Sequence, residues 1–264
     1  MRRAAVLGSP ISHSLSPALH RAAYRALGLD WFYEALQVEI GQLPGFVDAL
    51  DETWVGLSLT MPLKEAVLDL AREVDPLARV TDSANTLLLP QRHALNTDVD
   101  GLVTALRRAG LVAPAGFTGT VIGAGATARS AIAAMRELGA AQVQLLARRP
   151  EAADPTRRTA DLLGVPLLVR PLTEVGPLSA PLVISTIPAG AADHLAGAVP
   201  ARPGLLLDVV YAPWPTPLAR AWQAGGGRIV SGLEMLLGQA ERQVELMTGR
   251  PAPTDAMRAA LPGA

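Results

Sequence analysis

The sequence contains no cysteine, which excludes disulfide bonds, thiolate nucleophiles and zinc sites built on cysteine. Histidine is also rare, and the four histidines do not follow a spacing typical of metal ligands. We therefore expect no bound metal. These four residues are His13, His20, His93 and His194.

Net charge is nearly absent as well, since 23 Lys and Arg residues balance 24 Asp and Glu residues. This balance argues against nucleic acid or an anionic membrane as a partner. Residues 109–128 and 175–192 carry no charge, but Gly and Pro interrupt both stretches, so neither is expected to span a membrane. The first residues run into Gly8-Ser9-Pro10 without the apolar core of a signal peptide. We expect a soluble cytoplasmic protein, either a monomer or a homodimer.

Lysine and asparagine are almost missing. Of the 23 basic residues 22 are arginine, so Lys64 is the single lysine, and Asn85 and Asn96 are the two asparagines. Codon bias accounts for such a composition without any function. The same bias makes the surviving residues candidates for positions where a compact ammonium group or a short amide cannot readily be replaced.

What is abundant is apolar sequence, because 50% of the 264 residues are hydrophobic and only 18% are charged. A chain of this length can bury a large core in one or two domains. Short apolar runs alternate with helical patterns, which predicts an α/β fold. In the first part of the chain we expect three helices. One begins at Ser16, whose hydroxyl caps it, a second covers 63–74, and a third is capped by Asp98 and runs to about Arg108. Strands are expected over 3–7, 31–38, 55–60, 86–89 and 94–96.

From Thr118 onward the pattern predicts a doubly wound, six-stranded parallel sheet. A helix is expected over 127–138, ending at Gly139, and the last thirty or so residues should be helical with a break near 249–253. The six strands are expected at 119–122, 143–146, 167–169, 182–185, 205–209 and 229–230.

The segment from Val121 to Ala128 is typical of a dinucleotide-binding turn. Gly123 permits the tight turn after the strand, Gly125 lets a pyrophosphate approach the backbone, and the following helix offers free N–H groups. The next strand ends in Arg148-Arg149 rather than in an acidic residue, and two arginines suit a ribose 2′-phosphate. The less favoured alternative is two solvated surface residues in an arginine-rich protein. We favour NADP(H) as the cofactor.

Four polar clusters lie before Thr118, outside the part of the chain that is expected to bind the dinucleotide. They follow strand ends or precede helices, at residues 12–17, 60–64, 84–86 and 96–98. Their hydroxyls, amides, ammonium group and carboxylate are the groups that a small polyhydroxylated acid would require. Hydride transfer to a carbonyl also needs a proton donor, and Lys64 oriented by Asp98 can serve. The alternative is an ordinary surface salt bridge.

Together these motifs resemble the shikimate dehydrogenase family over nearly the whole chain. The resemblance rests on 8–17, 60–64, 84–86, 96–98, 123–126 and 235–240, in order and at similar spacing. It implies an NADP-dependent oxidoreductase that reversibly reduces 3-dehydroshikimate to shikimate in aromatic amino-acid biosynthesis. It also implies a substrate domain with a mixed sheet at 1–100, completed by helices at 236–264, and a Rossmann-like NADP domain at 101–235.

The resemblance further assigns roles to individual residues. Lys64 and Asp98 would form the catalytic pair, with Lys64 handling the proton. Substrate would be bound by Ser14, Ser16, Thr60, Asn85, Tyr211 and Gln239. Cofactor would be bound by Gly123, Ala124, Gly125, Ala126, Thr127, Arg148, Arg149, Ser185, Thr186, Val209 and Gly232.

Some positions and interpretations stay open. The chain has Ala147-Arg148-Arg149 where the family often has Asn-Arg-Thr, and Ser185-Thr186 where Asn-Ala is more usual. His13 is interpreted as structural, and Tyr211 could be a packed aromatic residue at a strand end. The substrate could be quinate or an amino analogue of shikimate. A protein that binds NADP as a regulator without catalysis is the alternative from another class.

Overall fold

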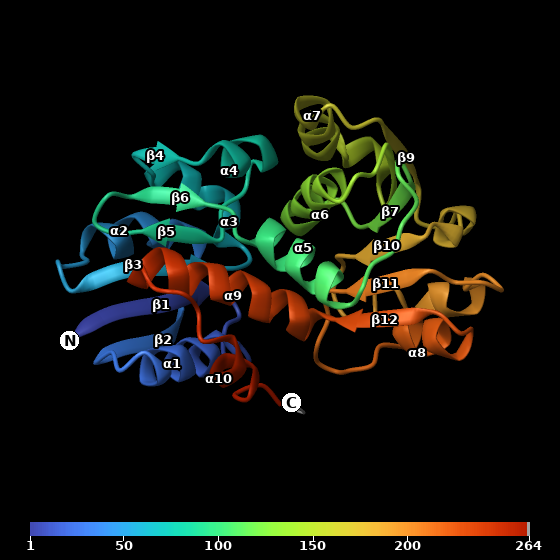
Figure 1. Cartoon of the computed structure of the whole chain (residues 1–264). Helices are drawn as coiled ribbons and strands as arrows, with labels where there is room; N and C mark the ends of the chain where they lie inside the picture. Colours follow the sequence, from blue (N-terminus) through green and yellow to red (C-terminus); the bar gives the residue numbers. More distant parts are fainter. Residues whose placement is uncertain (263–264) are drawn as a thin grey trace. The chain divides into compact units, whose positions relative to one another are not determined.

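The computed structural model describes residues 1–262 and divides the chain into two compact units. The first unit contains Met1–Gly101 and the chain from Leu236 onward, and the second contains Leu102–Met235. The chain passes between the units within α5 (Asp98–Arg108) and again within α9 (Gly232–Thr248). Over the described residues each unit is built on a six-stranded sheet with helices, so the predicted α/β class is confirmed (Figure 1).

The sheet of the first unit is mixed, with the order β2-β1-β3-β5-β6-β4. Strand β1 runs parallel to β2 and β3, whereas β5 runs antiparallel to both β3 and β6. These strands are β1 (Arg2–Gly8), β2 (Trp31–Gln37), β3 (Trp54–Leu59), β4 (Glu73–Val74), β5 (Thr86–Leu88) and β6 (His93–Leu95). The helices, besides α5 and α9, are α1 (Ser16–Ala26), α2 (Leu43–Asp48), α3 (Leu63–Ala66), α4 (Pro76–Thr81) and α10 (Thr254–Arg258), with 3-10 turns at Ile40–Gln42 and Val67–Leu70.

The alternating strand directions bring three polar segments to one edge of this sheet. Ser58 near the end of β3 pairs with Thr86 at the start of β5, and Thr86 pairs in turn with Leu95 at the end of β6. The residues that follow β3, precede β5 and follow β6 therefore meet at this edge. They are the predicted clusters at 60–64, 84–86 and 96–98.

Helix α9 approaches this sheet closely over β3. A Cβ atom on Gly56 would lie 2.8 Å from Cε of Met247, so the glycine leaves room for the methionine side chain. The core beside the sheet contains fully buried leucines from several elements, among them Leu57, Leu63 and Leu87. This close approach positions the amide side chains of α9 against the polar edge.

The second unit has a fully parallel sheet of order β12-β11-β10-β7-β8-β9, which is the doubly wound topology that the sequence predicts. Trp222 fills its core and donates an indole N–H bond to the carbonyl of Gly204. The strands are β7 (Thr118–Ile122), β8 (Gln142–Ala147), β9 (Leu167–Pro171), β10 (Leu182–Ser185), β11 (Leu205–Asp208) and β12 (Arg228–Ser231). The helices are α6 (Ala126–Glu137), α7 (Asp154–Leu163) and α8 (Pro217–Ala224), with 3-10 turns at Pro150–Ala152, Gly176–Ser179 and Asp193–Ala198.

Three local expectations are wrong. The helix expected over 63–74 is α-helical only over Leu63–Ala66 and continues as a 3-10 turn to Leu70, because the N–H groups of Arg72 and Glu73 bond to the carbonyl of Arg92 and draw the chain into β4. Ser16 is the first residue of α1 and does not cap it. Asp98 likewise lies inside α5, where its carboxylate bonds to other side chains. The predicted break after α9 is confirmed at 249–253.

His20 is fully buried on α1 in the first unit. Its ring stacks on Tyr33 with centroids 4.0 Å apart, and Nε2 lies 3.2 Å from Oε1 of Gln243. Burial lowers the pKa of His20 from 6.5 to about 3, against the opposing effect of the Gln243 hydrogen bond. The folded state therefore holds His20 neutral where the unfolded chain would protonate it.

This difference predicts how stability depends on pH. His20 contributes its full stability above the unfolded pKa of 6.5, and that contribution falls as pH drops toward about 3. Between pH 7 and pH 5 we expect the wild type to lose about 2 kcal/mol of unfolding free energy that the His20→Phe variant does not lose. Denaturant titrations at both pH values measure this. His194, which is exposed, supplies the control, because the His194→Gln variant should lose as much unfolding free energy as wild type. If His20→Phe lost as much as wild type, the prediction would be contradicted.

Candidate functional site

Lys64 and Asp98 form an ion pair at the polar edge of the first sheet. Nζ of Lys64 donates to Oδ2 of Asp98 at 2.5 Å, and the two side chains are only 14% and 6% exposed. Lys64 lies in the single turn of α3 that follows β3, and its carbonyl accepts a bond from the Ala84 N–H. Asp98 is the one acceptor of the ammonium group among the described residues. Two N–H bonds therefore remain for a ligand.

The side-chain amide of Asn85 joins this pair to α9. Its Nδ2 donates to Oδ1 of Asp98 at 2.8 Å and to Oε1 of Gln239 at 3.3 Å. Its Oδ1 accepts a bond of 2.8 Å from the backbone N–H of Thr97. A backbone N–H can only donate, so this contact distinguishes the oxygen of the amide from its nitrogen. Four of the predicted residues, Lys64, Asp98, Asn85 and Gln239, are thus brought into one hydrogen-bonded group.

Ser14 lies in the loop before α1, Ser16 is the first residue of α1, and Thr60 follows β3 in the same unit. Oγ of Ser14 accepts a bond from the Ser16 N–H, and the Ser9 N–H bonds to the carbonyl of Met61, which ties the serine loop to the segment after β3. The hydroxyls of Ser16 and Thr60 have no partner in the described part of the chain. His13 is exposed on this loop. These hydroxyls are available to a ligand.

Tyr211 belongs to the second unit, in the loop that follows β11. Burial raises the pKa of its phenol, which is half-buried and so neutral at physiological pH. Asp208 anchors this loop, because its carboxylate accepts bonds from the Val210 N–H and the Thr216 hydroxyl. Burial nevertheless raises the pKa of Asp208.

The turn from β7 into α6 has the geometry of a phosphate-binding turn. Gly123 has φ +109, and a Cβ atom there would lie 2.5 Å from Oγ1 of Thr186, so only glycine fits. Gly125 faces open space, and no side chain caps the N-terminus of α6. Free N–H groups and the positive end of the helix dipole suit an anion.

A cavity of about 940 Å³ opens beside this turn in the second unit. Gly123, Ala124 and Gly125 line it together with Arg148 and Arg149, and neither arginine has an ion-pair partner among the described residues. The donor set fits a dinucleotide with an added phosphate. The sequence did not identify the other lining residues, which are Leu146, Ala147, Ala152, Pro171, Leu172, Thr173, Ile187, Pro188, Ala191 and His194.

Other predicted cofactor residues do not line this cavity. Ala126 and Thr127 form the first turn of α6. Ser185 is buried where β10 ends, and Thr186 donates its hydroxyl bond to the carbonyl of Ile122. The last two predicted residues, Val209 and Gly232, are packed together, since a Cβ atom on Gly232 would collide with the carbonyl of Val209.

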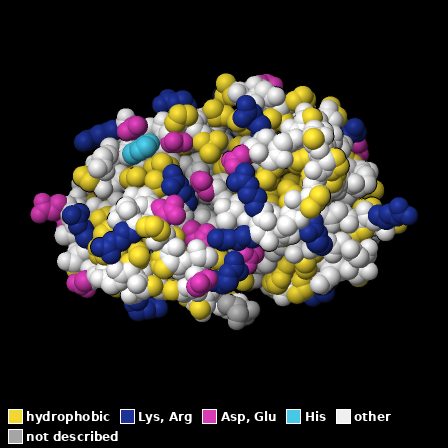
Figure 2. Space-filling model, viewed as in Figure 1, with side chains coloured by type: hydrophobic (Ala, Val, Ile, Leu, Met, Phe, Trp, Pro, Cys, Tyr) yellow, Lys and Arg dark blue, Asp and Glu magenta, His cyan; other side chains and the backbone are white. Residues whose placement is uncertain are grey.

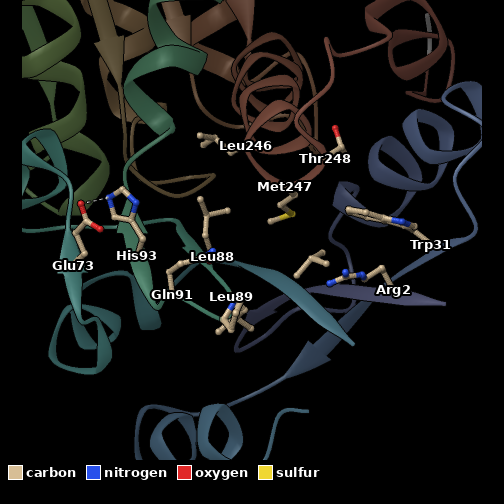
Figure 3. Close-up of a pocket in the computed structure, with 12 residues that line it drawn as sticks. Arg2, Trp31, Glu73, Leu88, Leu89, Gln91, His93, Leu246, Met247 and Thr248 are labelled. Carbon is tan, nitrogen blue, oxygen red and sulfur yellow. Dashed lines mark ion pairs between the residues drawn. The ribbon is translucent and has the colours of Figure 1, made fainter. Parts of the chain in front are cut away.

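A second cavity, of about 560 Å³, lies in the first unit but contains none of the predicted residues. Figure 3 shows it between the C-terminal part of α9 and the turn from β5 to β6, with Nε2 of His93 3.9 Å from Oε1 of Glu73. Trp31 and Met247 give it apolar walls. On the face that Figure 2 shows, basic and acidic side chains are interspersed.

Within residues 1–262, no three His, Asp or Glu side chains gather as metal ligands. No described helix has the length and apolar character needed to cross a membrane.

Comparisons with known proteins identify one family. Residues 6–87 match the family model of the shikimate dehydrogenase substrate binding domain, and residues 232–261 match that of the shikimate 5'-dehydrogenase C-terminal domain. A relative from Methanothermobacter thermautotrophicus, named shikimate dehydrogenase (NADP(+)), is 35% identical over 97% of this chain and 94% of its own length.

Solved structures give the same result. A shikimate 5-dehydrogenase from Mycobacterium fortuitum has a TM-score of 0.88 at 47% identity, covering 98% of this chain and 97% of that one. A Thermus thermophilus shikimate 5-dehydrogenase in complex with NADP(H) and shikimate has a TM-score of 0.86 at 32% identity, covering 99% of this chain and 100% of that one.

Proposed function

The chain belongs to the shikimate dehydrogenase family, and we propose that it catalyses the reversible, NADP-dependent reduction of 3-dehydroshikimate to shikimate. The observation that carries the proposal is the enclosed Lys64–Asp98 pair, which keeps two ammonium N–H bonds free beside unpartnered hydroxyls. A proton donor of this kind, next to donors for a carboxylate and ring hydroxyls, suits a polyhydroxylated ketone.

Each of the two units would bind a different ligand. The first, residues 1–100 completed by 236–264, would bind substrate, and the second, residues 101–235, would bind nucleotide. Ser14 and Ser16 would hold the substrate carboxylate through their hydroxyls. Thr60, Asn85, Tyr211 and Gln239 would bind the carboxylate or the ring hydroxyls.

Bound NADPH supplies the hydride for the carbonyl carbon. Nζ of Lys64 donates a proton to the carbonyl oxygen as negative charge develops there, which completes the alcohol. Asp98 accepts one N–H bond of Lys64 and so directs the remaining N–H bonds. In the oxidation direction neutral Lys64 takes the hydroxyl proton back.

The nucleotide would lie on the β7–α6 turn. Gly123, Ala124, Gly125, Ala126 and Thr127 would surround the pyrophosphate, and Arg148 and Arg149 would pair with the 2′-phosphate. On the nicotinamide side we propose Ser185, Thr186, Val209 and Gly232. The enzyme would act in the cytoplasm, as a monomer or a homodimer.

A spectrophotometric assay tests the activity. Shikimate with NADP⁺ should produce NADPH, and quinate should be turned over far more slowly. Faster turnover of quinate would change the substrate assignment. Tight NADPH binding without turnover of either compound would instead indicate a regulator.

Lys64 gives the sharpest mutational prediction. We expect Lys64→Ala to lower kcat by about a thousandfold or more with little change in NADPH affinity, because the proton donor is lost while the second unit is untouched. Lys64→Arg should also lose most activity, since a guanidinium does not release its proton. Steady-state kinetics and NADPH fluorescence titration measure the two effects. Near-wild-type kcat in either variant would refute the catalytic assignment.

We expect Arg148 and Arg149 to determine the preference for NADP⁺ over NAD⁺. Replacing both with alanine should weaken NADP⁺ binding by about tenfold to a hundredfold and leave NAD⁺ binding nearly unchanged, because only the former carries the 2′-phosphate. The KM values for both nucleotides provide the measurement. Arg157→Ala, at an exposed arginine of α7, is the matched control, and an equal loss for NAD⁺ would count against a 2′-phosphate role.

A further inference from the structure

Gln243 is a fully buried amide on α9 that the proposed mechanism does not use. Its Nε2 donates to the backbone carbonyl of Asn85 at 3.2 Å and to the hydroxyl of Thr86 at 3.0 Å. Its Oε1 accepts a bond of 2.8 Å from Ser58 and lies 3.2 Å from Nε2 of His20. Every hydrogen-bonding position of the amide is therefore used.

Backbone groups determine the direction of this network. The carbonyl of Asn85 can only accept, so Nε2 of Gln243 must face it. Because Thr86 receives the second N–H bond of that nitrogen, its own O–H is directed elsewhere, and Oδ1 of Asn85 lies 3.1 Å away. The N–H of Thr97 donates to the same Oδ1. The Nδ2 end of Asn85 is thereby left facing Asp98.

The opposite orientation of the Asn85 amide would be unfavourable. Rotation by about half a turn would place Oδ1 of Asn85 against Oδ1 of Asp98, two acceptors with no proton between them. The carboxylate would then turn away, and its direction toward Lys64 would be lost.

We propose that Thr86 and Gln243 are positioning residues of the reaction, which fix the Asn85 amide and, through it, the Asp98 carboxylate that orients Lys64. This inference rests on the proposed function. All hydrogen bonds of the Gln243 amide are made within the protein, and the Thr86 hydroxyl bonds to Gln243 and Asn85, so both residues act through Asn85. Hydrogen bonds in a chain polarise and strengthen one another, so loss of the bond between Gln243 and Thr86 weakens the bond between Thr86 and Asn85.

The experiment compares isosteric variants of the full-length enzyme with shikimate and NADP⁺. Thr86→Val and Gln243→Met should each lower kcat by about tenfold, while the KM for NADP⁺ stays unchanged. Thr86→Ser keeps the hydroxyl and should stay within about twofold of wild type. Because both residues act through one relay, the double variant should lose little more than the worse single variant. Thr120→Val, which removes a buried hydroxyl from β7, is the control and should retain wild-type kcat.

Three results would overturn the proposal. These are wild-type kcat in Thr86→Val, equal losses in Thr86→Ser and Thr86→Val, or a double variant whose losses multiply to about a hundredfold, as independent structural damage would. If Gln243→Met does not fold, the Thr86→Val and Thr86→Ser pair decides alone. Failure of wild type to oxidise shikimate would refute the proposed function itself, which separates the two cases.

Discussion

The hydrogen bonds of the Asn85 amide are the constraint on which the site depends. They join the start of β5 to the start of α5 through Thr97 and Asp98, and to α9 through Gln239. Asn85 is buried, and a buried amide without partners costs several kcal/mol, so the three segments have one favourable arrangement. That arrangement holds the Asp98 carboxylate beside Lys64 with its second oxygen free for the ammonium group. The mixed strand directions of the first sheet make it possible, because they bring these segments to one edge.

Much of this first unit could be predicted from local sequence. Apolar runs identified the strands, and the polar residues beyond them identified the edge, because a side chain after a buried strand is exposed where the sheet ends. The scarcity of Lys and Asn singled out Lys64 and Asn85. Asn96 was singled out in the same way, but its Nδ2 donates to Thr81 and its Oδ1 accepts the Asp98 N–H, so it supports the start of α5.

Other features depend on contacts that local sequence does not encode. The 63–74 segment has helical periodicity, yet backbone bonds to Arg92 turn its end into β4. The contacts of Gln243 with His20 and Ser58 join residues 223 and 185 positions apart. The sequence offered one indication of the role of Gln243, namely its position four residues after Gln239, which places both amides on one face of α9. In the second unit the conformation of Gly123 is local and was predictable, whereas Thr173 reaches the cavity from a loop and His194 from a 3-10 turn, neither of them within a motif.

The direction of the Lys64 ammonium group therefore depends on which end of the Asn85 amide faces Asp98. Neutron diffraction from crystals exchanged into deuterated solvent locates amide deuterons directly and distinguishes the two ends. We expect both deuterons on the atom nearest Oδ1 of Asp98, with one directed to that oxygen and one toward Gln239, and a further deuteron on the Thr86 hydroxyl directed to Oδ1 of Asn85. An amide oxygen facing Asp98, with the deuterons toward Thr97, would contradict this assignment.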